Sequence, residues 1–113
     1  MDVDIRAHAS YLPHSAQKVR LLVDLVRGKK AIDAINILRY APQSAATPLL
    51  KVINSAIANA EENFGVDRED LVIYQIFANE APTRKWRKFG ARGRFKPWLR
   101  RTSHVTVVLR ETE

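Results

Sequence analysis

The sequence has no cysteine among its 113 residues, so it can form no disulfide and no thiolate metal site. Its three histidines, His8, His14 and His104, lack metal-ligand spacing, and we expect no bound metal. It has no apolar run close to the ~20 residues that span a membrane. The opening MDVDIRAHAS carries acids where a secretory signal would be basic and then apolar. These absences predict a cytoplasmic protein.

Catalytic motifs are also missing. The chain has neither a phosphate-binding glycine loop nor a nucleophile elbow. The pairs Glu61-Glu62 and Glu69-Asp70 could nominally act as catalytic carboxylates, but they fall at an expected helix end and turn, where acids are routine. We therefore expect no enzyme, no catalytic residue, no cofactor and no small-molecule substrate.

Acidic residues are absent from one segment in particular. Residues 84–101, RKWRKFGARGRFKPWLRR, hold nine of the 19 Lys and Arg and none of the 12 Asp and Glu, a charge of +9. The remaining 95 residues carry ten basic and twelve acidic groups, a charge of −2. Concentrated positive charge on a nearly neutral body predicts a polyanionic partner.

The apolar residues, 46% of the chain, indicate one globular domain over residues 1–113. Ser15 can cap a helix that ends at Gly28, and a second short helix is expected in 29–40. Alternation in 1–12 predicts a strand that points one set of residues the same way: Val3, Ile5, Ala7, Ala9 and Tyr11.

The longest helix is expected to end just before Gly65. Thr47 as the N-cap with Pro48 as the first helical residue satisfies the local rules, whereas a start at Pro42 would place Pro48 inside the helix and kink it. Strands follow in 68–82 and 101–111. The order predicts an α+β fold, with three helices packed on a small three-stranded antiparallel sheet and a long protruding β-hairpin.

The hairpin arm, residues 82–102, connects the last two strands. If these strands pair continuously around Arg92, the numbers of opposite residues sum to 184. Trp86 then faces Trp98, Phe89 faces Phe95, and Ala91-Arg92-Gly93 remains as the turn. The same register predicts that Phe77 faces Val107 and that one face is buried: Leu71, Ile73, Phe77, Val105, Val107 and Leu109.

This arm is expected to reach roughly 33 Å from Pro82 to Arg92. Its register places Arg84 opposite Arg100 and Lys88 opposite Lys96, which is repulsive. Because a lone two-stranded ribbon is marginal in water, we expect a partner that supplies negative charge and flat surfaces. RNA offers both phosphates and bases that stack on aromatic rings.

Other readings of the arm stay open at this point. The basic run could be a solvated surface, and the tryptophans could serve only the hairpin's own stability. A free-standing nucleic-acid-binding or chaperone module would show the same strip. A membrane-active arm fits less well, because basic residues on both faces leave no one-sided apolar surface.

Three stretches carry a family resemblance: SAQKVRLLVDLVRGKKAIDAINIL (15–38), SAIANAEEN (55–63) and RTSHVTVVL (101–109). Together with the basic loop, they resemble the bacterial form of large-subunit ribosomal protein twenty-two along nearly the whole chain. The resemblance implies a structural constituent of the large ribosomal subunit that binds 23S-type ribosomal RNA, supports assembly, and lines the nascent-peptide exit tunnel with its hairpin tip. It also implies neighbouring ribosomal proteins and the nascent peptide as partners.

Carried onto this chain, the resemblance implies that about Lys85 to Phe95 faces the tunnel. The expected RNA-binding residues of the arm are Arg84, Lys85, Trp86, Arg87, Lys88, Phe89, Arg92, Arg94, Phe95, Lys96, Trp98, Arg100 and Arg101. Secondary RNA-binding candidates in the domain are His8, Lys18, Arg20, Arg27, Lys29 and Lys30. The last three could equally be favourable charges at a helix C-terminus.

Two residues depart from the family pattern. Gly90 stands where many members have a basic residue, and Trp86 stands where a smaller or charged residue is common. In the family, changes near the tip alter sensitivity to macrolide antibiotics. The shape of the tunnel wall and that sensitivity are therefore not carried over to this chain.

Overall fold

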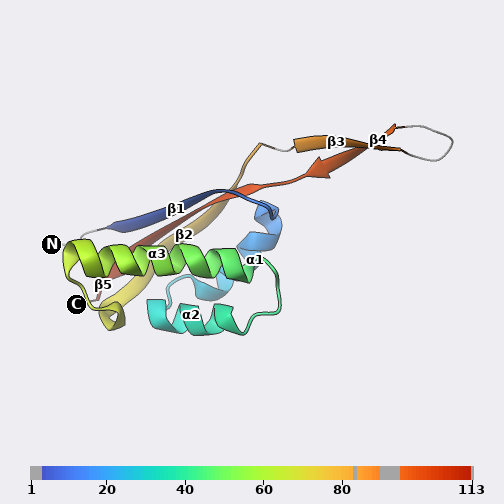
Figure 1. Cartoon of the computed structure of the whole chain (residues 1–113). Helices are drawn as coiled ribbons and strands as arrows, with labels where there is room; N and C mark the ends of the chain where they lie inside the picture. The colour runs from blue at the N-terminus through green and yellow to red at the C-terminus, as the bar shows by residue number, and fades with distance from the viewer. Residues whose placement is uncertain (1–3, 83, 90–94, 113) are drawn as a thin grey trace.

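The computed structural model describes residues 4–82, 84–89 and 95–112, with the course and pairing of the backbone alone for 84–89 and 95–100. Three helices lie on one face of a three-stranded antiparallel sheet (Figure 1). This arrangement confirms the predicted α+β fold. The strand order is β1–β5–β2, formed by Ile5–Leu12, Ser103–Glu111 and Leu71–Glu80.

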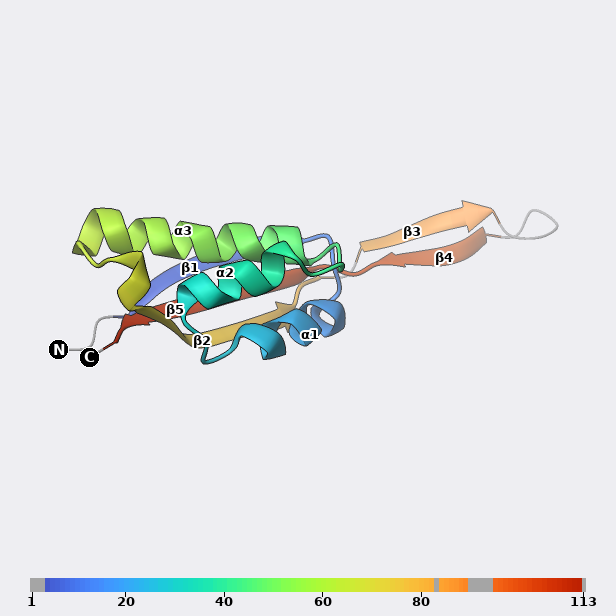
Figure 2. The ribbon, with the colours of Figure 1, turned by 90° about the horizontal axis from the view of Figure 1, so that it is seen from below.

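A second, two-stranded sheet projects from one end of the first. It pairs β3 (Arg84–Phe89) with β4 (Phe95–Arg100), and both chain termini lie at the opposite end of the molecule (Figures 1 and 2). The molecule measures 64 Å along its longest axis and 24 and 19 Å across. The hairpin therefore extends well beyond the packed body.

The first two helices form as their sequences predict. Helix α1 (Ala16–Val26) is capped by Ser15, whose hydroxyl oxygen accepts from the Lys18 N–H at 3.4 Å. Gly28 follows with a φ of 78°, a left-handed conformation that favours glycine. Helix α2 (Ala31–Arg39) buries its alanines and Leu38.

Helix α3 (Ala46–Phe64) begins one residue before the predicted N-cap. Ala45 is the N-cap, so the predicted capping role of Thr47 is wrong and Pro48 is the third helical residue. Proline is tolerated there because the first N–H groups of a helix have no intrahelical partner. At the other end, Gly65 takes the predicted left-handed conformation, with a φ of 64°.

The core lies between the helices and the sheet. Helix α3 packs over β1 and β5, whereas α1 lies along β2 (Figure 2). Burial of large aliphatic side chains contributes about 1.5–3 kcal/mol each, so this layer is the main source of stability. Its largest fully buried members include Ile5, Leu22, Leu49, Ile53, Leu71, Ile73, Ile76 and Leu109.

The predicted register was correct in the hairpin and wrong in the main sheet. Ile76, not Phe77, faces Val107, and Phe77 is 39% exposed. The cause is a register shift between Ile73 and Gln75, where one extra residue enters β2. Side chains alternate along a strand, so the extra residue changes which positions face the core. Leu71 and Ile73 are buried before the bulge, and the even-numbered Ile76 and Ala78 are buried after it.

A second irregularity interrupts the first strand. Its pairing with β5 shifts between Ala9 and Leu12, and Tyr11 has a φ of 56° and is 57% exposed. The prediction that Tyr11 points the same way as Ile5, Ala7 and Ala9 is therefore wrong, and the half-buried Leu12 packs against the core instead. Val3 lies outside the described residues.

Candidate nucleic-acid interface

The hairpin brings like charges into direct register. Arg84 pairs with Arg100 and Lys88 with Lys96 across the two strands, as the sequence predicts. Trp86 pairs with Trp98, and Phe89 with Phe95. Charged and aromatic positions thus alternate in matched pairs along a ribbon without a single acid.

The base of the hairpin is tied to the main sheet. The Ala81 N–H donates to the Thr102 carbonyl at 3.0 Å, and the Thr102 hydroxyl donates to the Pro82 carbonyl at 3.1 Å. The residue numbers of paired residues add up to 183 at Glu80 and Ser103 but to 184 at Arg84 and Arg100. The register therefore shifts by one residue between the two sheets, and they do not form one continuous ladder. The predicted turn Ala91-Arg92-Gly93, with Gly90 and Arg94 beside it, lies outside the described residues.

Two of the predicted domain arginines bind the sheet itself. Arg20 donates from Nε to the Ala78 carbonyl at 3.0 Å, and Arg27 donates from a terminal nitrogen to the Ile76 carbonyl at 3.1 Å. The other terminal nitrogen of Arg27 pairs with Asp24 at 2.8 Å. Both arginines therefore hold α1 against the outer edge of β2, a role that the sequence pattern did not indicate.

The turn after α1 completes this contact. The Gly28 N–H donates to the Ile73 carbonyl at 3.2 Å, and the Ile73 N–H donates to the Lys29 carbonyl at 2.9 Å. Lys30 forms an isolated bridge with Val72. The backbone is thus fixed while the side chains of Lys29 and Lys30, like that of Lys18 on α1, stay exposed. RNA contact by this group stays a prediction.

Replacing Arg20 or Arg27 by Gln is expected to lower the free energy of unfolding by about 1 kcal/mol, because each change removes a bond to a carbonyl at the sheet edge. Urea unfolding of the purified chain measures the change. Lys18→Gln is the matched control, since the Lys18 side chain is exposed on the same helix. Equal losses in all three variants would contradict the edge role.

His8 lies apart from these residues, on the sheet face opposite the helices. Its Nδ1 is 2.8 Å from the Thr106 hydroxyl, and its ring centroid is 5.9 Å from that of His104. Tyr11 packs edge-on against His104 at 4.7 Å and donates its backbone N–H to His104 Nδ1. This ring cluster was not predicted, because the shift that exposes Tyr11 leaves no mark in the sequence.

Elsewhere on the sheet, Arg110 of β5 contacts Asp4, the residue before β1, and Tyr74 of β2. It is 2.6 Å from the Asp4 carboxylate and lies 3.4 Å over the Tyr74 ring. The hydrogen bond from Arg110, reinforced by the charges of Arg110 and Arg6, lowers the pKa of Asp4. This basic group is thus occupied within the domain.

A groove of about 240 Å³ runs between β1 and α3. Its lining is mostly apolar and includes no Asp or Glu, and its one hydroxyl, that of Ser55, donates to the Lys51 carbonyl. No three His, Asp or Glu side chains within the described residues come close enough to hold a metal ion. No helix in the described part of the chain is long and apolar enough to cross a membrane.

Comparison with known proteins gives one consistent result. Residues 7–110 match the family model described as ribosomal protein L22p/L17e. The chain is 48% identical over 108 residues to the large ribosomal subunit protein uL22 of Pediococcus pentosaceus, covering 96% of this chain and 92% of that protein. It is 49% identical over 109 residues to the protein of the same name from Clostridium novyi, covering 96% and 98%.

Proposed function

The chain belongs to the ribosomal protein L22p/L17e family, and on this premise we propose that it binds large-subunit ribosomal RNA through the β3–β4 hairpin. The family is one of structural ribosomal proteins, so the chain is not an enzyme and its place is in the ribosome of the cytoplasm. Both relatives are named as large-subunit proteins, and we assign this chain to the same subunit.

The observation that carries the proposal is the register of the hairpin. Two like-charged pairs and two aromatic pairs face one another in a ribbon that projects from the body (Figure 1). Like charges directly opposite each other destabilise a two-stranded ribbon, which is marginal by itself. Phosphates on both sides would remove this repulsion, and unstacked bases would cover the rings.

The position of the hairpin supports a location inside RNA. It leaves the body at the end opposite the termini, in a molecule 64 Å long (Figure 2). An arm of this kind can enter a layer of RNA while the domain stays on its surface. We place the segment from about Lys85 to Phe95 at the wall of the nascent-peptide exit tunnel, where its tip would contact the nascent peptide.

The globular domain would then support assembly of the large subunit. Its described exposed basic side chains on and after α1, including Lys18, Lys29 and Lys30, can bind further phosphates, while Arg20 and Arg27 hold the helix in place. Binding by both parts would connect separate RNA segments and stiffen them. Neighbouring ribosomal proteins complete the set of proposed partners.

Sedimentation of cell extract on sucrose gradients tests the proposal. We expect the chain to track the large subunit at moderately high salt, because a threaded arm is held by shape as well as by charge. A free-standing nucleic-acid-binding or chaperone module would be released, since its affinity falls steeply with salt. Recovery of the chain only in the top fractions would contradict the assignment.

A further inference from the structure

The two edges of the main sheet differ in how many of their outward backbone groups are hydrogen-bonded. On β2, the outer edge is covered: Arg27 and Arg20 bind the Ile76 and Ala78 carbonyls, and the turn at Gly28 and Lys29 binds Ile73. On β1, at the other edge, the described residues show one outer contact, from the Asn59 side-chain amide to the Arg6 carbonyl at 3.5 Å. Natural sheets usually protect such edges, so a bare edge requires an explanation.

The hydrogen-bond pattern shows which groups of β1 are free. Because the Ile76 and Ala78 carbonyls point outward, the bonds between β2 and β5 run through the alternate residues, such as Phe77 with Thr106. The bonds between β5 and β1 must then run through pairs such as Ala7 with Val107. His8, like Arg6, therefore directs its backbone N–H and C=O away from the sheet.

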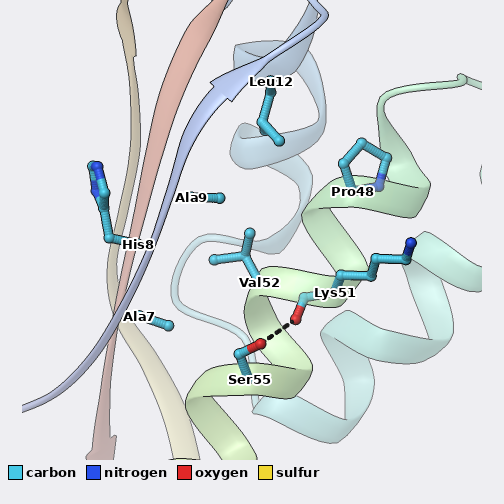
Figure 3. A pocket seen from close by; sticks show the side chains of 8 residues that line it. All are labelled: Ala7, His8, Ala9, Leu12, Pro48, Lys51, Val52 and Ser55. Carbon is cyan, nitrogen blue, oxygen red and sulfur yellow. Dashed lines mark hydrogen bonds between the residues drawn. The ribbon is translucent and has the colours of Figure 1, made fainter.

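An apolar groove lies directly beside this edge. Figure 3 shows Ala7, Ala9 and Leu12 of β1 pointing toward α3, with the His8 ring on the opposite side of the strand. The lining from α3 recurs every three or four residues: Pro48, Lys51, Val52 and Ser55. Ser55 donates to the Lys51 carbonyl at 3.0 Å, and the Lys51 side chain extends away from β1 (Figure 3). No charged group of the lining thus points into the groove.

We propose that this edge and groove bind an extended segment of another protein of the large subunit, which adds to β1 as a fourth strand. The Arg6 N–H and both backbone groups of His8 would bind the segment's main chain, while the Arg6 carbonyl keeps its contact with Asn59. Alternate apolar side chains would enter the groove over the two alanines. The inference rests on the proposed large-subunit membership and concerns a surface that the hairpin does not use.

The chemistry of the groove favours a peptide over RNA. A peptide strand matches the two-residue repeat of donors and acceptors along the free edge, and a ribose-phosphate chain does not. The lining is mostly apolar and its one lysine extends away from β1 (Figure 3), so it also offers phosphates far less counter-charge than the basic hairpin does. The shift between Ala9 and Leu12 ends the straight edge, so the added strand would be short.

Site-specific photo-cross-linking in purified large subunits tests the inference. Benzoylphenylalanine placed at Ser55 lies over the groove, and at Asn54, an adjacent exposed residue of α3 outside the groove lining, it serves as the matched control. We expect irradiation to join position 55, and not position 54, to a single extended segment of another ribosomal protein. Mass spectrometry of the cross-linked peptides identifies that segment.

A backbone variant tests strand addition separately. His8→Pro removes the outward N–H but no bond to β5, whereas His8→Val keeps the N–H and likewise loses the ring. In the Ser55 cross-linking background we expect about tenfold less adduct with Pro than with Val. Thermal unfolding of both variants checks that the domain remains folded.

The outcomes separate this inference from the proposed function. A cross-link from position 55 to RNA or to a second copy of the chain, no adduct above the Asn54 level, or equal adduct for His8→Pro and His8→Val would overturn strand addition and leave RNA binding intact. Failure of the unsubstituted chain to enter large subunits would overturn the proposed function and this inference with it.

Discussion

Changing Arg94, Lys96, Arg100 and Arg101 together to Gln is expected to exclude the chain from large subunits when it competes with the unsubstituted chain. Each phosphate contact contributes about −0.7 to −0.9 to the slope of log affinity against log salt, so losing four contacts makes that slope less negative by about three. Quantitative mass spectrometry of purified subunits measures the ratio of the two chains, and salt titrations with rRNA fragments measure the slope.

The matched control keeps the charge and changes the side chain. Exchanging lysine and arginine at the same four positions preserves every positive group, so phosphate binding should largely persist, although bidentate contacts would be lost. Equal incorporation of the Gln variant and the unsubstituted chain would count against RNA binding by the arm. Equal exclusion of both variants would show that packing at these positions, rather than charge, decides incorporation.

The second large effect concerns the folded body that carries the arm. Leu22, on the inner face of α1, is completely buried, whereas the adjacent Leu21 is 63% exposed. Leu22→Ala is expected to lower the free energy of unfolding by about 2–5 kcal/mol, because it removes buried methyl groups and leaves a cavity. Leu21→Ala, which deletes the same atoms at the surface, should change it by less than about 0.5 kcal/mol.

Urea unfolding of the isolated chain measures both values. A loss of about 2–5 kcal/mol is a large share of the ~5–15 kcal/mol of a typical domain, so Leu22→Ala should also lower the amount of chain that enters subunits. Comparable destabilisation by the two leucine variants would contradict the packing described for α1.

The hairpin register could be predicted because several independent features agree on it. Facing aromatic residues, Trp86 with Trp98 and Phe89 with Phe95, fix the pairing without reference to the rest of the fold. The main sheet could not be predicted in the same way. Its bulge near Tyr74 carries no glycine or other local signal, and one extra residue is enough to reverse every later side chain.

In the candidate site, too, some features can be predicted from the sequence and others depend on tertiary packing. Composition alone identifies the basic strip, because nine cations without an acid need no knowledge of the fold. The role of Arg20 and Arg27 depends on which β2 carbonyls lie beside α1, and only the tertiary packing determines this. The groove depends on Ala7 and Ala9 lying opposite α3, and two alanines in a strand pattern predict no such space.

The start of α3 shows why capping rules can miss by one or two residues. Thr47 followed by Pro48 satisfies the local rules for a helix start, yet the helix begins at Ala46. Ala46 is buried and its N–H donates to the Gln43 carbonyl, so a preceding turn and core packing extend the helix beyond the local signal. Packing outweighs a cap worth about 1 kcal/mol.

The proposed position of the β3–β4 hairpin is inside large-subunit ribosomal RNA. A cryo-electron microscopy structure of large subunits that contain this chain measures it directly. We expect RNA phosphates within hydrogen-bonding distance of Arg84, Lys88, Lys96 and Arg100 along both strands, with the domain at the subunit surface. A hairpin that lies in solvent, or one that contacts protein alone, would contradict it.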